Sequence, residues 1–214
     1  MNTYQGRRRG PKPQFNELHL IESALNAGLD KFTLTGVARD LGVSTPSLYR
    51  IIDARADLVD LCLRHISQQK FLPSPVSVTK HKGEPEWQSY IWGMSEMLWD
   101  LMQQYPGLSL ALAQHPGAPA HGEHYIVQLK DKLVETGFPG KEESLDFIIH
   151  LIGDTVITTD IFTTHMRSVD SYDLAKKNPH PDADEVNQVG KAQLETKVQF
   201  IIDAVAAGVN LPTA

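Results

Sequence analysis

Apolar residues recur with the period of an α-helix from one end of the chain to the other. Leu34, Val37, Ala38 and Leu41, for example, are spaced so that they would share one face of a helix. No segment shows the sustained alternation of apolar and polar residues that is typical of a β-strand. The helical period therefore predicts an all-α protein. A chain of 214 residues can also bury a sizeable core without disulfide bonds, so we expect it to be globular.

Glycine, proline and polar residues interrupt this pattern and divide the chain into parts. The interruption at 70–85 contains three prolines and one glycine, a composition typical of a connection between domains. We predict an N-terminal arm, a small helical domain, this connection and a larger helical domain, at 1–14, 15–69, 70–85 and 86–214.

Within the two domains, caps and breakers predict where the helices begin and end. Asp53 is expected to be the N-cap of the fourth helix. The polar stretch at 168–185, with two prolines and five acidic residues, is expected to be a surface loop. The helices are expected at 16–27, after residue 33 or 35, and at 45–51, 54–69, 86–105, 108–114, 122–136, 141–166 and 186–207.

Residues 33–50 carry the most specific pattern. Two short helices, each with its own cap, are joined by the tight turn Leu41-Gly42-Val43-Ser44. This arrangement predicts a helix-turn-helix, whose second helix can enter the major groove of DNA. Hydroxyls at the start of that helix and two longer side chains after them can reach phosphates and base edges: Ser44, Thr45, Ser47, Tyr49 and Arg50. A plain helical hairpin in a core is the alternative, but it has no need for so many hydroxyls.

The N-terminal arm is a second signal for nucleic acid, although the formal net charge of the chain is -6. Residues 1–65 contain nine Lys and Arg against seven Asp and Glu, whereas residues 66–214 contain eleven against nineteen. The first fourteen residues contain four basic residues and no acidic one: Arg7, Arg8, Arg9 and Lys12. Arginines beside glycine and proline stay extended and fit a narrow minor groove, although a solubilising tail is the alternative. The charge distribution therefore predicts that the N-terminal end faces DNA.

The N-terminal part of the chain contains a set of residues at the positions where a known family of proteins has the same residue types. These residues are Ala24, Gly28, Phe32-Thr33-Leu34, Val37-Ala38, Leu41-Gly42-Val43-Ser44, Leu48-Tyr49-Arg50 and Arg55. With these residues, the stretch from about Phe15 to Ile66 resembles the N-terminal domain of the tetracycline-repressor (TetR) family of transcriptional regulators. The family usually has His-Phe where this chain has Ile51-Ile52, and Ile52 can fill the core in place of the aromatic ring.

The resemblance implies DNA contacts at positions that match the family pattern. They are Thr33, Thr35, Ser44, Thr45, Ser47, Tyr49 and Arg50, with Arg55 contacting a phosphate. Arg39 is either a further phosphate contact or solvated surface.

The resemblance also implies that the larger domain binds a small-molecule inducer and that its last two long helices form a dimer interface. The final helix is consistent with this, because its apolar residues exceed what a surface helix needs: Leu194, Val198, Phe200, Ile201, Ile202 and Val205. A two-fold dimer would present two recognition helices to a palindromic operator.

Two helices of the larger domain hold candidate ligand-binding residues. Trp92, Met94, Trp99 and Met102 lie on the apolar sides of the helix at 86–105. They are either core or the wall of a pocket for an apolar or aromatic ligand. His150, Asp154 and Thr158 form a polar stripe on the apolar helix at 141–166. A polar stripe on a buried helix needs partners, which are hydrogen bonds inside the protein, a ligand or, less favoured, a metal.

Together these patterns predict a ligand-responsive DNA-binding regulator, most simply a repressor released from its operator by a small apolar or aromatic molecule. We expect it not to be an enzyme and to need no cofactor or metal. With a single cysteine, Cys62, and no apolar signal segment, it is expected to be a cytoplasmic homodimer without a membrane partner. The alternatives are a helical-bundle enzyme that uses His150 and Asp154, and a DNA binder without an inducer.

Overall fold

The computed structural model describes residues 15–69, 71–75, 85–167 and 183–212. Every regular element in these ranges is a helix, so the prediction of an all-α fold is confirmed. The N-terminal helices are α1 (Glu17–Ala27), α2 (Leu34–Asp40), α3 (Thr45–Leu48) and α4 (Arg55–Ser67). The remaining helices are α5 (Glu86–Gln104), α6 (Leu108–Gln114), α7 (Ala118–Glu135), the short 3₁₀ turn η2 (Glu142–Ser144), α8 (Leu145–Arg167) and α10 (Ala183–Ala206).

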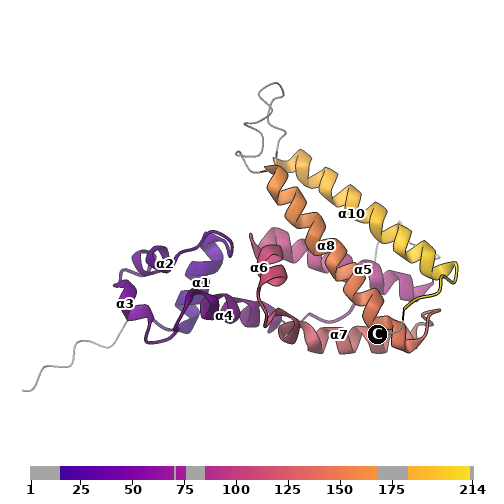
Figure 1. The fold of residues 1–214 in the computed structure, drawn as a ribbon, viewed down its shortest axis with the longest axis horizontal. Helices are drawn as coiled ribbons and strands as arrows, with labels where there is room; N and C mark the ends of the chain where they lie inside the picture. Colours follow the sequence, from indigo (N-terminus) through magenta and orange to yellow (C-terminus); the bar gives the residue numbers. More distant parts are fainter. Residues whose placement is uncertain (1–14, 70, 76–84, 168–182, 213–214) are drawn as a thin grey trace, which may run out of the picture.

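The helices form two groups that lie end to end (Figure 1). The small group contains α1 to α4, with α2 and α3 at the end that is farthest from the rest of the molecule. In the larger group, α8 packs along α10 on one side and against α5 on the other. Helix α4 leaves the small group and packs against α7, so it bridges the two domains.

The core of the small domain is made by the inner faces of its four helices. Leu20, Leu48 and Leu58 come from three of them and are completely buried. Ile52 is also buried, so it fills the core as expected at the position where the related family usually has an aromatic ring. Burying such side chains supplies most of the free energy that holds short helices together, because helices of this length are marginal on their own.

The start of α2 agrees with the prediction, whereas α1 begins one residue after its predicted start. Asn16 caps α1, and the Oγ1 atom of Thr33 accepts a hydrogen bond of 3.0 Å from the Gly36 N–H at the start of α2. The prediction that Asp53 caps α4 is wrong. The N-cap is Ala54, and a carboxylate one turn inside the helix, that of Asp57, accepts from the N–H groups of Asp53 and Ala54 at 2.7 and 2.8 Å.

Other helix boundaries differ from the predictions by a few residues. Helix α7 begins at Ala118 rather than at 122, because a proline is compatible with the first turn of a helix. The α-helical part of α3 ends at Leu48, and 49–51 continue as a turn. The predicted surface loop at 168–185 lies mostly outside the described residues, as does the whole N-terminal arm.

Candidate nucleic-acid interface

A helix-turn-helix is formed by α2 and α3. The turn between them depends on Gly42, whose φ of 66° lies in the left-handed region that favours glycine. Two backbone hydrogen bonds close the end of α2: Val43 N–H donates to the Ala38 carbonyl at 2.9 Å, and Gly42 N–H donates to the Arg39 carbonyl at 3.1 Å. This pair of bonds is the Schellman arrangement that ends many helices at a glycine. The turn therefore fixes how α3 leaves α2.

The side chains that are predicted from the sequence to contact DNA lie on and around α3. Thr35, Ser44, Tyr49 and Arg50 are exposed, and Tyr49 keeps 51% of its surface accessible. Three further candidates are Thr33, which is exposed, and Thr45 and Ser47, which are half-buried. Leu48 is completely buried in the middle of this group, so it anchors α3 to the core while its neighbours face outward.

Some of these hydroxyls already have partners inside the protein. Thr33 Oγ1 is the cap of α2, and Ser44 Oγ lies 2.8 Å from Ser47 Oγ. A hydroxyl both donates and accepts, so each can still contact a phosphate or a base edge. Arg39 is exposed together with Arg50. The arm residues Arg7, Arg8, Arg9 and Lys12 lie outside the described residues.

Arg55, the predicted phosphate contact, has a different environment. Its Nη2 atom donates to the Leu29 carbonyl at 2.7 Å and its Nε atom donates to the Phe32 carbonyl at 3.2 Å. Its guanidinium carbon also lies 4.2 Å from the centre of the Phe32 ring, a cation–π distance. The side chain is therefore engaged with the loop between α1 and α2.

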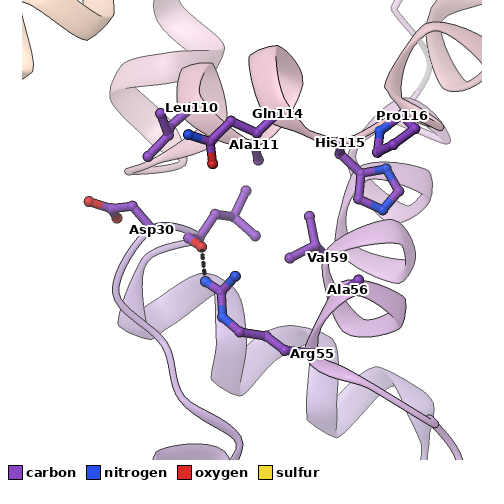
Figure 2. A pocket seen from close by; sticks show the side chains of 10 residues that line it. Asp30, Arg55, Ala56, Val59, Leu110, Ala111, Gln114, His115 and Pro116 are labelled. Carbon is purple, nitrogen blue, oxygen red and sulfur yellow. Dashed lines mark hydrogen bonds between the residues drawn. The ribbon is translucent and has the colours of Figure 1, made fainter.

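The same loop contacts the larger domain beside a pocket of about 290 Å³ (Figure 2). The Leu29 N–H donates to the Pro106 carbonyl in the α5–α6 turn at 2.8 Å. The pocket lies between the first turns of α4 and the helix α6. Its wall consists of Leu29, Asp30, Arg55, Ala56, Val59, Leu110, Ala111, Gln114, His115 and Pro116.

A second interdomain contact involves Asp60 in the middle of α4. Its Oδ1 atom lies 2.8 Å from Nε2 of His121 and 4.0 Å from Nδ1 of His115. A Cβ atom on Gly117 would lie 3.2 Å from the same carboxylate oxygen, so the glycine allows this close approach. Sequence reasoning missed this contact, because the partners are about sixty residues apart and no local pattern links them.

In the larger domain, the four candidate residues of α5 are confirmed as buried. Trp92, Met94, Trp99 and Met102 each keep 5% or less of their surface accessible. They lie in the core that α5 shares with α8 and α10. These side chains therefore lie in an apolar environment, as the sequence predicts, and their contact with a ligand stays a prediction.

The polar stripe on α8 is placed differently from the prediction. His150, Asp154 and Thr158 are all exposed, so the expectation that they face the inside of the domain is wrong. His150 Nδ1 lies 2.6 Å from the Asp146 carbonyl, and Thr158 Oγ1 donates to the Asp154 carbonyl at 2.6 Å. Helix α8 presents its apolar side to α5 and α10, and this turns the polar stripe outward.

The buried polar side chains of α8 lie on a different side of the helix from this stripe, and they were not predicted from the sequence. Asp160 is only 3% accessible, and its carboxylate accepts from Ser109 Oγ at 2.6 Å and from Gln103 Nε2 at 2.9 Å. A signal was present, because Asp160 follows Ile149, Ile152 and Val156 on the apolar stripe at helical spacing. The carboxylate thus joins α8 to both α5 and α6.

The described residues contain no group of three or more His, Cys, Asp or Glu side chains placed to hold a metal ion. None of the helices in the same ranges combines the length and the apolar character that crossing a membrane requires.

A two-domain, all-helical protein with a helix-turn-helix at one end is the class that this geometry defines. Solved structures share the arrangement. The TetR family protein ActR from Streptomyces coelicolor matches with a TM-score of 0.64 and 17% identity, over 93% of this chain and 98% of ActR. Its complex with actinorhodin matches with a TM-score of 0.62 and 17% identity over 92% and 98%. The regulator SCO7222, a TetR from the same organism, matches with a TM-score of 0.58 and 13% identity over 90% and 98%.

A sequence relative is consistent with these structures. The HTH-type transcriptional repressor DrrR1 from Streptomyces coeruleorubidus is 29% identical over 109 residues, which are 48% of this chain and 38% of that repressor. The match thus spans well under half of the length of the relative. No protein-family model matches the chain. The TetR resemblance predicted from the sequence is confirmed at the level of the fold.

Proposed function

We propose that this protein is a transcriptional repressor that binds operator DNA as a homodimer and is released by a small apolar or aromatic molecule. The observation that carries the proposal is the helix-turn-helix at the outer end of the molecule, with Tyr49 and Arg50 exposed beside the buried anchor Leu48. The TetR regulators with the same fold and the repressor DrrR1 support it. A DNA partner also agrees with the cytoplasmic location that the sequence predicts.

The proposed DNA contacts are those around α3. In the major groove, Arg50 can donate to guanine or to a phosphate, Tyr49 can donate to a phosphate, and the small hydroxyls at the start of α3 allow close approach. The arginines of the N-terminal arm would follow the adjacent minor groove. Thr35 and Arg39 would contact the backbone from α2.

The proposed dimer uses the outer faces of α8 and α10. Phe162 of α8 and Phe200 of α10 are 67% and 74% accessible, and Phe147 and Val189 are also exposed large apolar residues on these helices. Large apolar side chains that a single copy leaves exposed on two adjacent helices are typical of an interface. A two-fold axis through this face would make a four-helix bundle and would hold two recognition helices at a fixed distance.

The proposed effector site is inside the larger domain. The buried Trp and Met side chains of α5 would supply its apolar wall, and the buried Asp160 with Ser109 and Gln103 would supply a polar group beside α6. ActR, which has the same fold, has been solved with actinorhodin bound. An effector that binds one arrangement of the two domains more tightly than the other would shift the population away from the DNA-binding arrangement.

The enzyme that uses His150 and Asp154 is not proposed. Both side chains are exposed on α8, and the imidazole nitrogen of His150 contacts a carbonyl of its own helix. On this face they would instead lie at the proposed dimer interface.

The DNA proposal is tested by selecting binding sites from random duplexes and then measuring variants on the selected site. Repeated selection should return a palindrome whose half-sites are about one helical turn apart. Arg50→Ala and Tyr49→Ala should each weaken binding about tenfold or more, since a good contact to a base or phosphate is worth about 1–3 kcal/mol. Arg64→Ala is the matched control: it also removes one arginine, but Arg64 lies on α4 and forms an ion pair of 2.8 Å with Glu17 of α1. The proposal fails if no sequence is enriched, or if both variants bind like the wild type.

A further inference from the structure

The Arg55 side chain contacts the loop between α1 and α2 at two points, and we call these contacts together the grip of Arg55. Nη2 donates to the carbonyl of Leu29, as the dashed line in Figure 2 shows, and Nε donates to the carbonyl of Phe32. The guanidinium also covers the Phe32 ring at 4.2 Å. One planar group therefore fixes both ends of a four-residue segment, which a single-point cation such as lysine cannot do.

The gripped segment also contacts the larger domain from its other side. The same residue whose carbonyl binds Arg55, Leu29, donates its N–H to Pro106 at 2.8 Å. The backbone at Gly107 approaches so closely that a Cβ atom there would lie 2.4 Å from the Asp30 nitrogen. Residues 29 and 30 are thus held between α4 of the small domain and the α5–α6 turn of the larger one.

The segment leads directly into the helix-turn-helix. Phe32, the second anchor of Arg55, is followed by Thr33, whose side chain caps α2. A displacement of the Phe32 carbonyl would move the first turn of α2, and the tight turn at Gly42 would pass that movement to α3. Loss of the contacts of Arg55 would therefore be expected to change where α3 lies relative to the larger domain.

We propose that Arg55 is a positioning residue, which sets the place of the helix-turn-helix on the larger domain, and not a DNA phosphate contact. The proposal rests on the proposed DNA-binding function. In a dimer, the place of each helix-turn-helix determines the spacing of the two recognition helices, so loss of the grip should weaken operator binding although no DNA contact is removed. Two hydrogen bonds and one cation–π contact within the protein hold the side chain in this position.

The salt dependence of binding separates the two roles. Each phosphate contact that is lost should lower the slope of log K against log salt concentration by about 0.9. We would measure Arg55→Gln, Arg55→Lys and Arg50→Gln by fluorescence anisotropy on the selected operator duplex over a series of KCl concentrations. All measurements are made at a temperature where circular dichroism shows every variant to be folded.

We expect Arg55→Gln to weaken binding about tenfold, because the charge-assisted hydrogen bonds to both carbonyls are lost, with the salt slope unchanged because no phosphate contact is removed. Arg55→Lys should not restore affinity, because lysine keeps the charge but cannot bridge the two carbonyls. The proposal is overturned if Arg55→Gln lowers the slope by about 0.9 per protomer and lysine restores it, which is the behaviour of a phosphate contact. It is also overturned if the folded variant binds with full affinity, since the residue would then only contribute stability.

A second measurement needs no DNA. Hydrogen exchange of the Leu29 amide, which is bonded to Pro106, should become about tenfold faster in Arg55→Gln and stay unchanged in Arg50→Gln. An unchanged exchange rate of the Leu29 amide in Arg55→Gln would show that Arg55 does not hold the loop. If the wild-type protein binds no duplex, the proposed function fails, and the exchange result still decides whether Arg55 holds the loop.

Discussion

The carboxylate of Asp60 in α4 lies 2.8 Å from Nε2 of His121 in α7, and this hydrogen bond joins the small N-terminal domain to the larger domain. The imidazole is mostly buried, whereas the carboxylate keeps 39% of its side-chain surface accessible. Water therefore weakens the interaction, and we assign it a modest contribution to stability. Its importance lies in its place, because α4 bridges the two domains at this point.

His121→Ala should lower the free energy of unfolding by about 1 kcal/mol, the usual net value of such a hydrogen bond. Urea denaturation followed by circular dichroism measures this. His124→Ala is the matched control, because His124 is exposed nearly one turn later on α7. Equal stabilities of the two variants would show that the contact between Asp60 and His121 contributes nothing.

Asp160 and Asp154 are six residues apart on α8 and should respond very differently to replacement by alanine. Asp160→Ala leaves Ser109 and Gln103 without their buried acceptor and should cost about 3 kcal/mol or more. Asp154→Ala removes an exposed side chain and should change stability by less than about 0.5 kcal/mol. Thermal unfolding of both variants tests the assignment of the buried and exposed faces of α8. A similar loss in both would contradict it.

Gly107 and Gly137 have nearly the same positive φ, 83° and 79°, but different surroundings. A Cβ atom at Gly107 would lie 2.4 Å from the backbone nitrogen of Asp30, whereas at Gly137 nothing lies within 4 Å. Alanine strains the backbone equally at both positions, and only Gly107→Ala also forces the two domains apart. We expect it to cost about 1–3 kcal/mol more than Gly137→Ala in the free energy of unfolding. Equal costs would mean that the domains separate freely at this point.

Stability should fall in alkaline solution partly because of Cys62. Burial raises the pKa of this thiol to about 12 from its usual value of 9.0, since a thiolate would be desolvated in the core. Above about pH 9 the unfolded chain loses this proton while the folded protein retains it, so the free energy of unfolding decreases as the pH rises toward 12.

Denaturation of the wild type and of Cys62→Ala at pH 8 and pH 10 measures this contribution. The pH-dependent loss should be smaller in the variant, although burial also raises the pKa of Tyr125 to about 12, so some loss remains. In the native protein at pH 8, iodoacetamide should leave Cys62 unmodified. Rapid alkylation without unfolding would show that the thiol is accessible.

The exposed aromatic residues of the last two long helices should determine the oligomeric state. Phe162→Glu combined with Phe200→Glu places four carboxylates in the proposed interface of the dimer, so we expect a monomer by sedimentation velocity. Val127→Glu is the control, because Val127 is exposed on α7 and lies outside that interface. If the double variant sediments like the wild type, the dimer uses another surface.

Several features of this protein could be predicted from the sequence because they depend on neighbouring residues. The period of the apolar residues predicts helices, and a local cap such as Thr33 predicts where α2 begins. The turn at Gly42 also depends only on adjacent residues, so the helix-turn-helix was predicted correctly. Each of these signals acts within about one turn of helix.

Other features were decided only by the tertiary structure. Periodicity shows that α8 has a polar stripe, but not whether it faces inward, and the packing of α5 and α10 against α8 left His150 outside and Asp160 inside. The partners of Arg55 and Asp60 are more than twenty and about sixty residues away in the chain. The Arg55 contacts form when α4 packs against the α1–α2 loop, and the Asp60 contact forms when α4 packs against α7. Long-range packing and not local preference determines which polar groups are brought together. The sequence alone determined the helices and the helix-turn-helix, whereas the tertiary structure decided how that motif is held on the rest of the protein.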